Sequence, residues 1–181
     1  DIIIDNKSIL NLAKIFKKNK DIIFVTPSIS EKFENLRKKK IIYKNKIKAA
    51  CMMCDVKKLK KIGFFDEDFF LYWEDVFLMR KISRSKFKML LCKNAIAKHS
   101  SGASTVNNSK VQFVRNLNFK YGEYLYDFKI KKFRFIKLVR QLLQSIIYFI
   151  LSSLSLNKNF AIKNIAYTFG IIKFIIYYLR K

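Results

Sequence analysis

The chain has few acidic residues, few cysteines and a single proline. Its 13 Asp and Glu stand against 38 Lys and Arg, and the formal net charge of +25 favours anionic partners such as phosphates, acidic lipid headgroups or nucleic acid. Three cysteines are an odd and small number, which argues against a disulfide framework and for a reducing compartment. Hydrophobic residues make up 51% of the 181 residues, enough for a core, which argues against general disorder.

The start of the chain has only a short apolar run. The first residue is Asp1 rather than Met, and Ile2–Ile4 is too short to be the apolar part of a signal peptide. We therefore expect the sequence to be the later part of a longer protein, with some residues of any site lying outside it.

The three cysteines offer a possible zinc site. Cys51 and Cys54 form a C-x-x-C pair, and Cys92 with His99 would complete four ligands. Residues 49–54, however, are typical of a buried strand, in which positions three apart face opposite sides. We therefore interpret the thiols as small apolar core residues.

Hydrophobic periodicity and turn signals predict alternating helices and strands as far as residue 99. The predicted helices cover residues 7–20, 56–62 and 73–83, and the predicted strands cover residues 21–28, 41–43, 49–54, 87–91 and 95–99. A loop at 100–109 and a helix at 111–131 follow. This alternation predicts an α/β domain over residues 1–130.

The last fifty residues have a different composition. After Asp127 the chain has no acid but eleven Lys and Arg. Residues 141–157 are uncharged and mostly apolar, and residues 165–179 are apolar apart from Lys173. A membrane-spanning helix needs about 20 apolar residues, so the pattern leaves open whether these helices span a membrane, lie on it or pack on the core. We expect residues 131–181 to be a tail that associates with an anionic membrane surface.

Five of the 13 acidic residues fall within ten positions. They are Asp66, Glu67, Asp68, Glu74 and Asp75. Helix capping or the helix dipole accounts for each of them taken singly. Trp73, the only tryptophan, directly precedes the last pair, and its ring face is a good platform for the apolar C–H groups of a sugar. An aspartate beside such a platform is well placed to take a proton from a sugar hydroxyl.

The only histidine, His99, ends a predicted strand. A lone histidine is more often structural than catalytic. Here a Ser- and Gly-rich segment, residues 100–105, follows at once. An imidazole at the carboxyl end of a strand before such a loop is well placed as a metal ligand near phosphate.

These motifs, in this order, resemble those of family 2 glycosyltransferases. They are AACMM at 49–53, IGFFDEDFF at 62–70, WED at 73–75 and HSSGAS at 99–104. Within the family the chain looks most like bacterial rhamnosyltransferases and galactofuranosyltransferases, and the resemblance covers roughly residues 1–120. It implies an α/β fold of the GT-A, Rossmann-like type, with residues 1–130 as its C-terminal, acceptor-side part.

The resemblance also implies a reaction. A sugar would pass from a nucleotide-sugar donor to an acceptor with inversion, usually with a divalent cation, Mn or Mg. Asp75 would be the general base that deprotonates the acceptor hydroxyl, and Trp73 and Glu74 would bind the acceptor. Asp66, Glu67 and Asp68 are also expected on the acceptor-binding side, where they would shape the turn and the acceptor loop.

On the donor side, the resemblance implies His99 and Asp1 as metal ligands, with Asp1 closing an Asp-x-Asp-like motif. Arg115 and Ser104 would contact the donor diphosphate. The chain departs from the family at Phe77, where the usual motif has an acid. It also lacks the opening nucleotide-binding strands, so we expect the chain alone to bind donor poorly and to be inactive by itself.

The predicted function is therefore sugar transfer to a glycan or lipid-linked acceptor in bacterial cell-surface polysaccharide biosynthesis. The protein would lie at the cytoplasmic face of the cell membrane, peripheral or integral. Two alternatives remain: a non-catalytic basic module for acidic lipid or nucleic acid, and an inactive glycosyltransferase fragment. Alternating basic and aromatic residues at 131–135 favour the binding module, but the acidic segment would repel phosphates, so nucleic acid is the less favoured partner.

Overall fold

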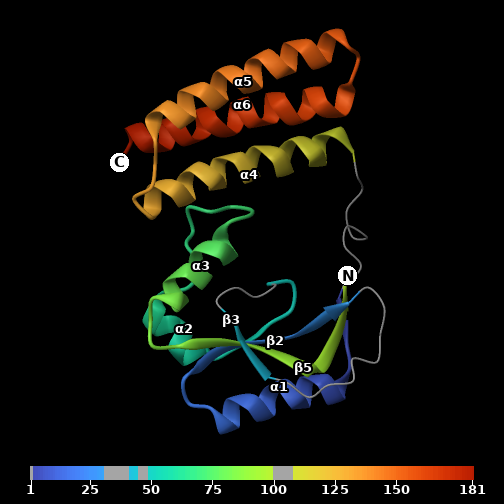
Figure 1. Cartoon of the computed structure of the whole chain (residues 1–181), viewed down its shortest axis with the longest axis vertical. Helices are drawn as coiled ribbons and strands as arrows, with labels where there is room; N and C mark the ends of the chain where they lie inside the picture. The colour runs from blue at the N-terminus through green and yellow to red at the C-terminus, as the bar shows by residue number, and fades with distance from the viewer. Residues whose placement is uncertain (1, 31–40, 45–48, 100–107) are drawn as a thin grey trace. The chain divides into compact units, whose positions relative to one another are not determined.

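The computed structural model describes residues 2–30, 41–44, 49–99 and 108–181 (Figure 1). The chain divides into two compact units. The first, here called the sheet unit, comprises Asp1–Asp66 and Asp75–Ser104. The second, the helical unit, comprises Glu67–Glu74 and Thr105–Lys181. Each unit is described by itself below.

The sheet unit contains a mixed sheet of five strands, ordered β1-β5-β2-β4, with β3 paired to β5 off this path. The strands are β1 (Ile2–Ile4), β2 (Ile22–Ser30), β3 (Ile41–Lys44), β4 (Met53–Cys54) and β5 (Lys88–His99). Only β2 and β5 run parallel, and the other pairs are antiparallel. The predicted α/β class is therefore confirmed at the level of a mixed sheet with helices.

Helices cover both sides of this sheet in Figure 1: α1 (Asn6–Lys18) on one side, α2 (Val56–Ile62) and α3 (Glu74–Ser83) on the other. Leu12 and Ile15 of α1 belong to one core cluster, and residues of α2 and α3 belong to a second. Asp5 and Asp55 cap α1 and α2 by accepting the backbone N–H of the third residue beyond them. Fully burying one aliphatic side chain contributes roughly 1.5–3 kcal/mol.

The predicted buried strand at 49–54 is wrong for most of its length. Only Met53 and Cys54 pair with β2, while residues 49–50 form a turn. Ala49 and Met52 pack against the second core cluster without joining the strand ladder, so their apolar character reflects packing rather than strand pairing. Cys92 is a core residue as predicted, but Cys54 is exposed.

The two strands predicted at 87–91 and 95–99 are one strand, β5, with an irregularity between them. Opposite β2, the register jumps from Pro27↔Cys92 to Ser28↔Ile96. Helix α1 holds this bulge, because the Asn11 side chain donates to Asn94 O at 3.1 Å and Ile96 N donates to Ser8 Oγ at 2.9 Å. The polar residues at 93–94 therefore mark a bulge within one strand rather than a gap between two strands.

The helical unit contains α4 (Ser109–Lys129), α5 (Phe135–Leu154) and α6 (Lys158–Leu179). Helix α6 contacts both α4 and α5 and lies between them (Figure 1). Gly170 permits the close approach of α4, since a Cβ atom there would stand 2.5 Å from Leu117 O. The helix predicted at 111–131 is confirmed as α4, and its Asn108 cap accepts Val111 N–H at 2.9 Å.

Two helices in the described part of the chain, α5 and α6, are long and apolar enough to cross a membrane. The predicted division at residue 130 concerns functional roles and stays a prediction. The compact units themselves divide elsewhere, because α4 packs along α6.

Candidate functional site

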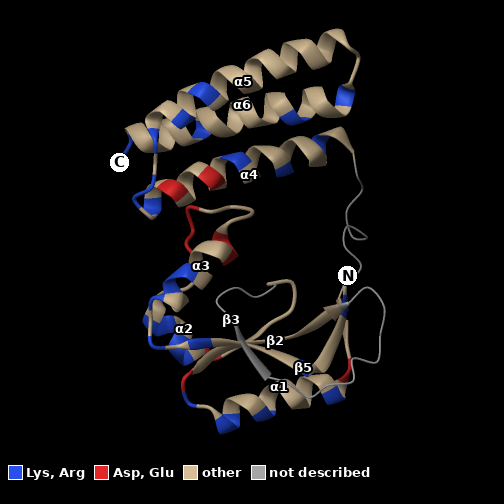
Figure 2. Ribbon diagram, viewed as in Figure 1, with Lys and Arg blue, Asp and Glu red and all other residues tan. Residues whose placement is uncertain are grey.

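The acidic segment links the two units. Asp66 ends one stretch of the sheet unit, Glu67–Glu74 belongs to the helical unit, and Asp75 returns to the sheet unit. Figure 2 shows these acids against a mostly basic chain. Before the segment, Gly63 ends α2 with a left-handed φ of 81°. Lys81 of α3 steadies this turn by donating to Gly63 O at 3.1 Å and Phe64 O at 3.0 Å.

Trp73 is held by α4. Its indole Nε1 donates to Phe119 O at 3.0 Å, and its ring packs against the rings of Phe119 and Tyr126, with centroids 5.7 and 5.3 Å away. Gly122 makes room for it, because a Cβ atom there would stand 2.7 Å from Trp73 Cδ1. The sequence did not reveal this packing role. The acceptor-platform role stays a prediction.

The backbone just before α3 is strained. Tyr72 and Trp73 have φ values of 66° and 72°, in the left-handed region that non-glycine residues rarely adopt. Such residues cost of order 1–3 kcal/mol each and persist only where their surroundings fix them. The contacts of Trp73 with α4 hold this strained backbone in place. Strain of this kind clusters at functional sites.

Asp68 lies in the segment just before α3 and connects it to the C-terminal ends of α4 and α6. Its Oδ2 accepts from Lys129 Nζ and from the Tyr177 hydroxyl, both at 2.7 Å. The Lys129 hydrogen bond lowers the pKa of the Asp68 carboxyl, although partial burial acts the other way. Because the Asp68 side chain is 36% exposed, this ion pair contributes only about 0–1 kcal/mol. The acceptor-side role of Asp68 stays a prediction.

Glu74 and Asp75 form the first residues of α3, where the helix dipole favours negative charge. Asp75 Oδ1 accepts Val76 N–H at 2.7 Å. Glu74 Oε2 is buried and has no hydrogen-bond partner within the described residues. Leaving such an oxygen unsatisfied costs about 1–3 kcal/mol.

His99 lies at the carboxyl end of β5. The antiparallel register with β1 pairs it with Ile2, the residue that follows Asp1 in the chain. Asp1 and Ser104 lie outside the described residues, so their predicted roles have no structural test. His99 is half-buried, as is Arg115, which lies on α4 in the helical unit. Asp66 is half-buried and Glu67 is exposed.

The donor set implied for a cation is one imidazole and one carboxylate, from His99 and Asp1. Carboxylate oxygens suit Mg and Mn, whereas imidazole is the more usual ligand of metals such as Zn, Cu, Fe and Ni. Within the described ranges no three His, Cys, Asp or Glu side chains come together as a metal-binding group. Because Asp1 lies outside the described residues, the structure gives the place of His99 but does not bring the two implied ligands together.

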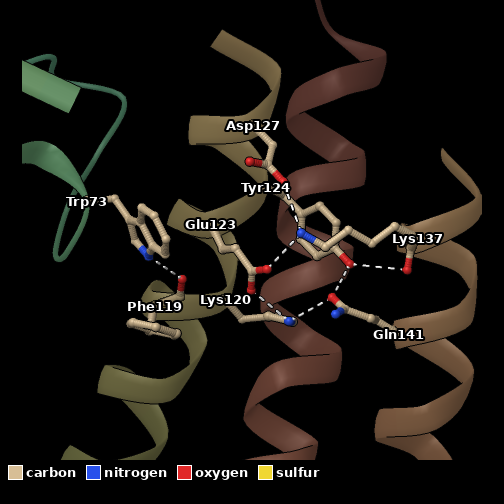
Figure 3. A network of polar contacts seen from close by, with 8 residues as sticks. All are labelled: Trp73, Phe119, Lys120, Glu123, Tyr124, Asp127, Lys137 and Gln141. Carbon is tan, nitrogen blue, oxygen red and sulfur yellow. Dashed lines mark hydrogen bonds and ion pairs between the residues drawn. The ribbon is translucent and has the colours of Figure 1, made fainter. Parts of the chain in front are cut away.

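A charge-balanced network joins α4 to α5 (Figure 3). Lys137 Nζ of α5 donates to Glu123 Oε1 and Asp127 Oδ2, both at 3.0 Å. Lys120 Nζ donates to Glu123 Oε2 and to Gln141 Oε1, both at 2.8 Å. Two lysines thus neutralise two carboxylates. This network, here called the latch, connects α4 to α5.

The directions of the pKa shifts in the latch agree with a charge-balanced connection between the two helices. Burial alone raises the pKa of the Glu123 carboxyl, but hydrogen bonds and charge from Lys120 and Lys137 outweigh it and lower the pKa overall. Burial raises the pKa of the Tyr124 hydroxyl, which donates to Gln141 Oε1 at 2.6 Å. The acids at positions 123 and 127 lie about one helical turn apart. This spacing is the feature of the sequence that could have indicated the network.

Comparison of the chain with protein-family models, with curated proteins and with solved structures gave no match.

Proposed function

We propose that the chain is the acceptor-side part of an inverting glycosyltransferase of the GT-A type, related to family 2. The observation that carries the proposal is the pairing of β1 with β5, which sets Ile2 opposite His99. The residue that follows Asp1 in the chain is therefore beside the single histidine, although most of the sheet unit separates the two in sequence. A metal site shared by an Asp-x-Asp-like motif and a histidine requires such a neighbourhood.

The acceptor side of the proposal rests on the start of α3. Asp75 accepts the proton of the attacking sugar hydroxyl, a contribution of about 10²–10⁴-fold to the rate. Glu74, whose Oε2 is buried without a partner among the described residues, accepts a hydrogen bond from another acceptor hydroxyl. Trp73 fixes the loop that leads into both residues.

On the donor side, a divalent cation held by Asp1 and His99 would neutralise the charge that develops on the departing nucleoside diphosphate. Arg115 and Ser104 are proposed to contact that diphosphate. The substrates are a nucleotide-sugar donor and a glycan or lipid-linked acceptor of bacterial cell-surface polysaccharide.

The proposed location is the cytoplasmic face of the cell membrane. Helices α5 and α6 are apolar, and no acid follows Asp127. Lys and Arg near an anionic membrane surface contribute roughly 1 kcal/mol each to binding, which favours the acidic lipids of that face.

The test is sugar transfer by the protein as its own cells make it, with nucleotide sugars and a lipid extract from those cells. We expect Asp75→Asn to lower transfer by about 10²–10⁴-fold. Asp21→Asn is the matched control, because Asp21 pairs only with Lys88 in an exposed ion pair of the same unit. Transfer by Asp75→Asn at the rate of the control would refute the catalytic role of Asp75.

A further inference from the structure

Helix α5 buries only one narrow stripe of its surface. Leu138, Ser145 and Ser152 recur every seven residues, and all three are buried. Ser145 Oγ lies 2.9 Å from Thr168 Oγ1 of α6, which places this stripe against α6. Two of the three residues are small and polar, so the contact with α6 uses little of the apolar surface of α5.

The opposite side of α5 is apolar and exposed. Its residues are spaced three or four apart, so they share one face of a helix with about 3.6 residues per turn. This face, here called the outer face, consists of Ile136, Val139, Leu143, Ile147, Ile150 and Leu154, which are 83%, 38%, 57%, 53%, 51% and 77% exposed. No described element of the helical unit covers it.

One of the two flanks of α5 between these faces carries polar residues. Gln141 and Gln144 line a cavity of about 230 Å³ together with Lys120 and Lys163. Arg140 and Gln144 line a neighbouring groove with Leu143 and Ile147 of the outer face. Cations thus border the aliphatic face directly, an arrangement that complements a bilayer with anionic headgroups.

Helix α6 is packed against a helix that cannot enter hydrocarbon. Its Lys173 donates to Asn118 Oδ1 of α4 at 3.2 Å and lies 4.4 Å from the Tyr121 ring centroid. Helix α4 carries Arg115, Lys120, Glu123 and Asp127. A charged side chain at the bilayer centre costs about 2.5–3.5 kcal/mol on insertion scales, so crossing by α6 would bring in its own lysine together with the charges of α4.

We propose that α5 is an interfacial helix. Its outer face lies among the acyl chains of an anionic bilayer, its axis lies along the membrane plane, and neither α5 nor α6 crosses the membrane. This inference rests on the membrane association proposed above and does not depend on sugar transfer.

The first test measures binding of the full chain to sealed vesicles of phosphatidylcholine and phosphatidylglycerol. Ile147→Glu places a charge on the outer face, and Gln144→Glu places the same charge less than one turn away on the polar flank. We expect Ile147→Glu to weaken binding by tenfold or more and Gln144→Glu by no more than about threefold, with the circular dichroism of both unchanged. Equal losses would overturn the assignment of the outer face.

The second test locates the turn between α5 and α6. Ser155→Cys is produced in cells, and inverted cell-membrane vesicles are treated with a membrane-impermeant maleimide. Because Cys54 is also exposed, labelling is read by peptide mapping. An interfacial α5 leaves Cys at position 155 labelled without detergent, whereas a spanning hairpin leaves it protected until detergent is added.

The outcomes separate the two proposals. Absence of binding to anionic vesicles refutes membrane association, and the interfacial helix with it. Binding with a protected turn refutes only the in-plane orientation. A dimer in analytical ultracentrifugation that Ile147→Glu dissociates, without vesicle binding, would assign the outer face to a second copy of the chain.

Discussion

The sheet unit and the helical unit place similar aliphatic residues in different surroundings. In the sheet unit, Leu78 and Ile82 of α3 are 1% and 0% exposed, within a core cluster shared with β2 and β5. In the helical unit, Leu143 and Ile147 of α5 are 57% and 53% exposed. A folded core accounts for the first pair, whereas the second pair lies on the exposed outer face that we propose contacts a membrane. Apolar content alone therefore does not distinguish a core helix from a membrane-binding one.

The largest expected effect compares the same substitution in both units. Leu78→Ala removes a buried side chain and should lower the free energy of unfolding by about 2–5 kcal/mol. Leu143→Ala removes an exposed side chain and should change it by no more than about 0.5 kcal/mol in the absence of lipid. Urea unfolding followed by circular dichroism measures both. Similar losses would mean that the outer face of α5 is part of a core.

A smaller effect is expected from the latch between α4 and α5. Glu123→Gln weakens hydrogen bonds from Lys120 and Lys137, and bonds to charged groups contribute about 1.5–3 kcal/mol each. We expect a loss of that order at pH 7, measured as the free energy of unfolding.

The same variant gives a pH test. The pKa of Glu123 is lowered in the folded protein, so its contribution is present above the ordinary value of about 4.3 and is lost as the pH falls through the lowered value. The stability difference between wild type and Glu123→Gln should therefore shrink below about pH 4. A difference that stays constant down to pH 2 would show that charge is not what holds the latch.

The smallest effect on stability is expected at Gly122. Alanine there gains helix propensity of about 1 kcal/mol against an overpacking cost of about 1–3 kcal/mol. Its methyl group must displace the Trp73 ring, so the fluorescence of this single tryptophan should shift to the red. Gly170→Ala is the control, because its clash is with Leu117 O and it should leave Trp73 emission unchanged. Identical spectra for the two variants would contradict the packing of Trp73 on α4.

Local features of the fold were predictable from sequence. The caps Asp5 and Asp55, the end of α2 at Gly63 and the helix after Trp73 all depend on side chains within a few residues. The bulge in β5 and the short β4 were not predicted, because both depend on which strand lies alongside.

For the candidate site, too, only features that depend on neighbouring residues could be predicted from the sequence. The motif residues at 73–75 and His99 were singled out from their sequence neighbours and from the family resemblance, and their proposed roles remain predictions. The packing of Trp73 against Gly122 and the pairing of His99 with Ile2 were not found, since each joins residues far apart in the chain. The latch was also missed, because charges on a helix face are usually solvated.

The central claim is that Asp75 is the base of a sugar transfer while the outer face of α5 contacts the membrane. The most direct test measures sugar transfer and vesicle binding side by side for wild type and Asp75→Asn. The account predicts that Asp75→Asn loses transfer by about 10²–10⁴-fold and binds anionic vesicles as tightly as wild type. Undiminished transfer by Asp75→Asn would contradict it.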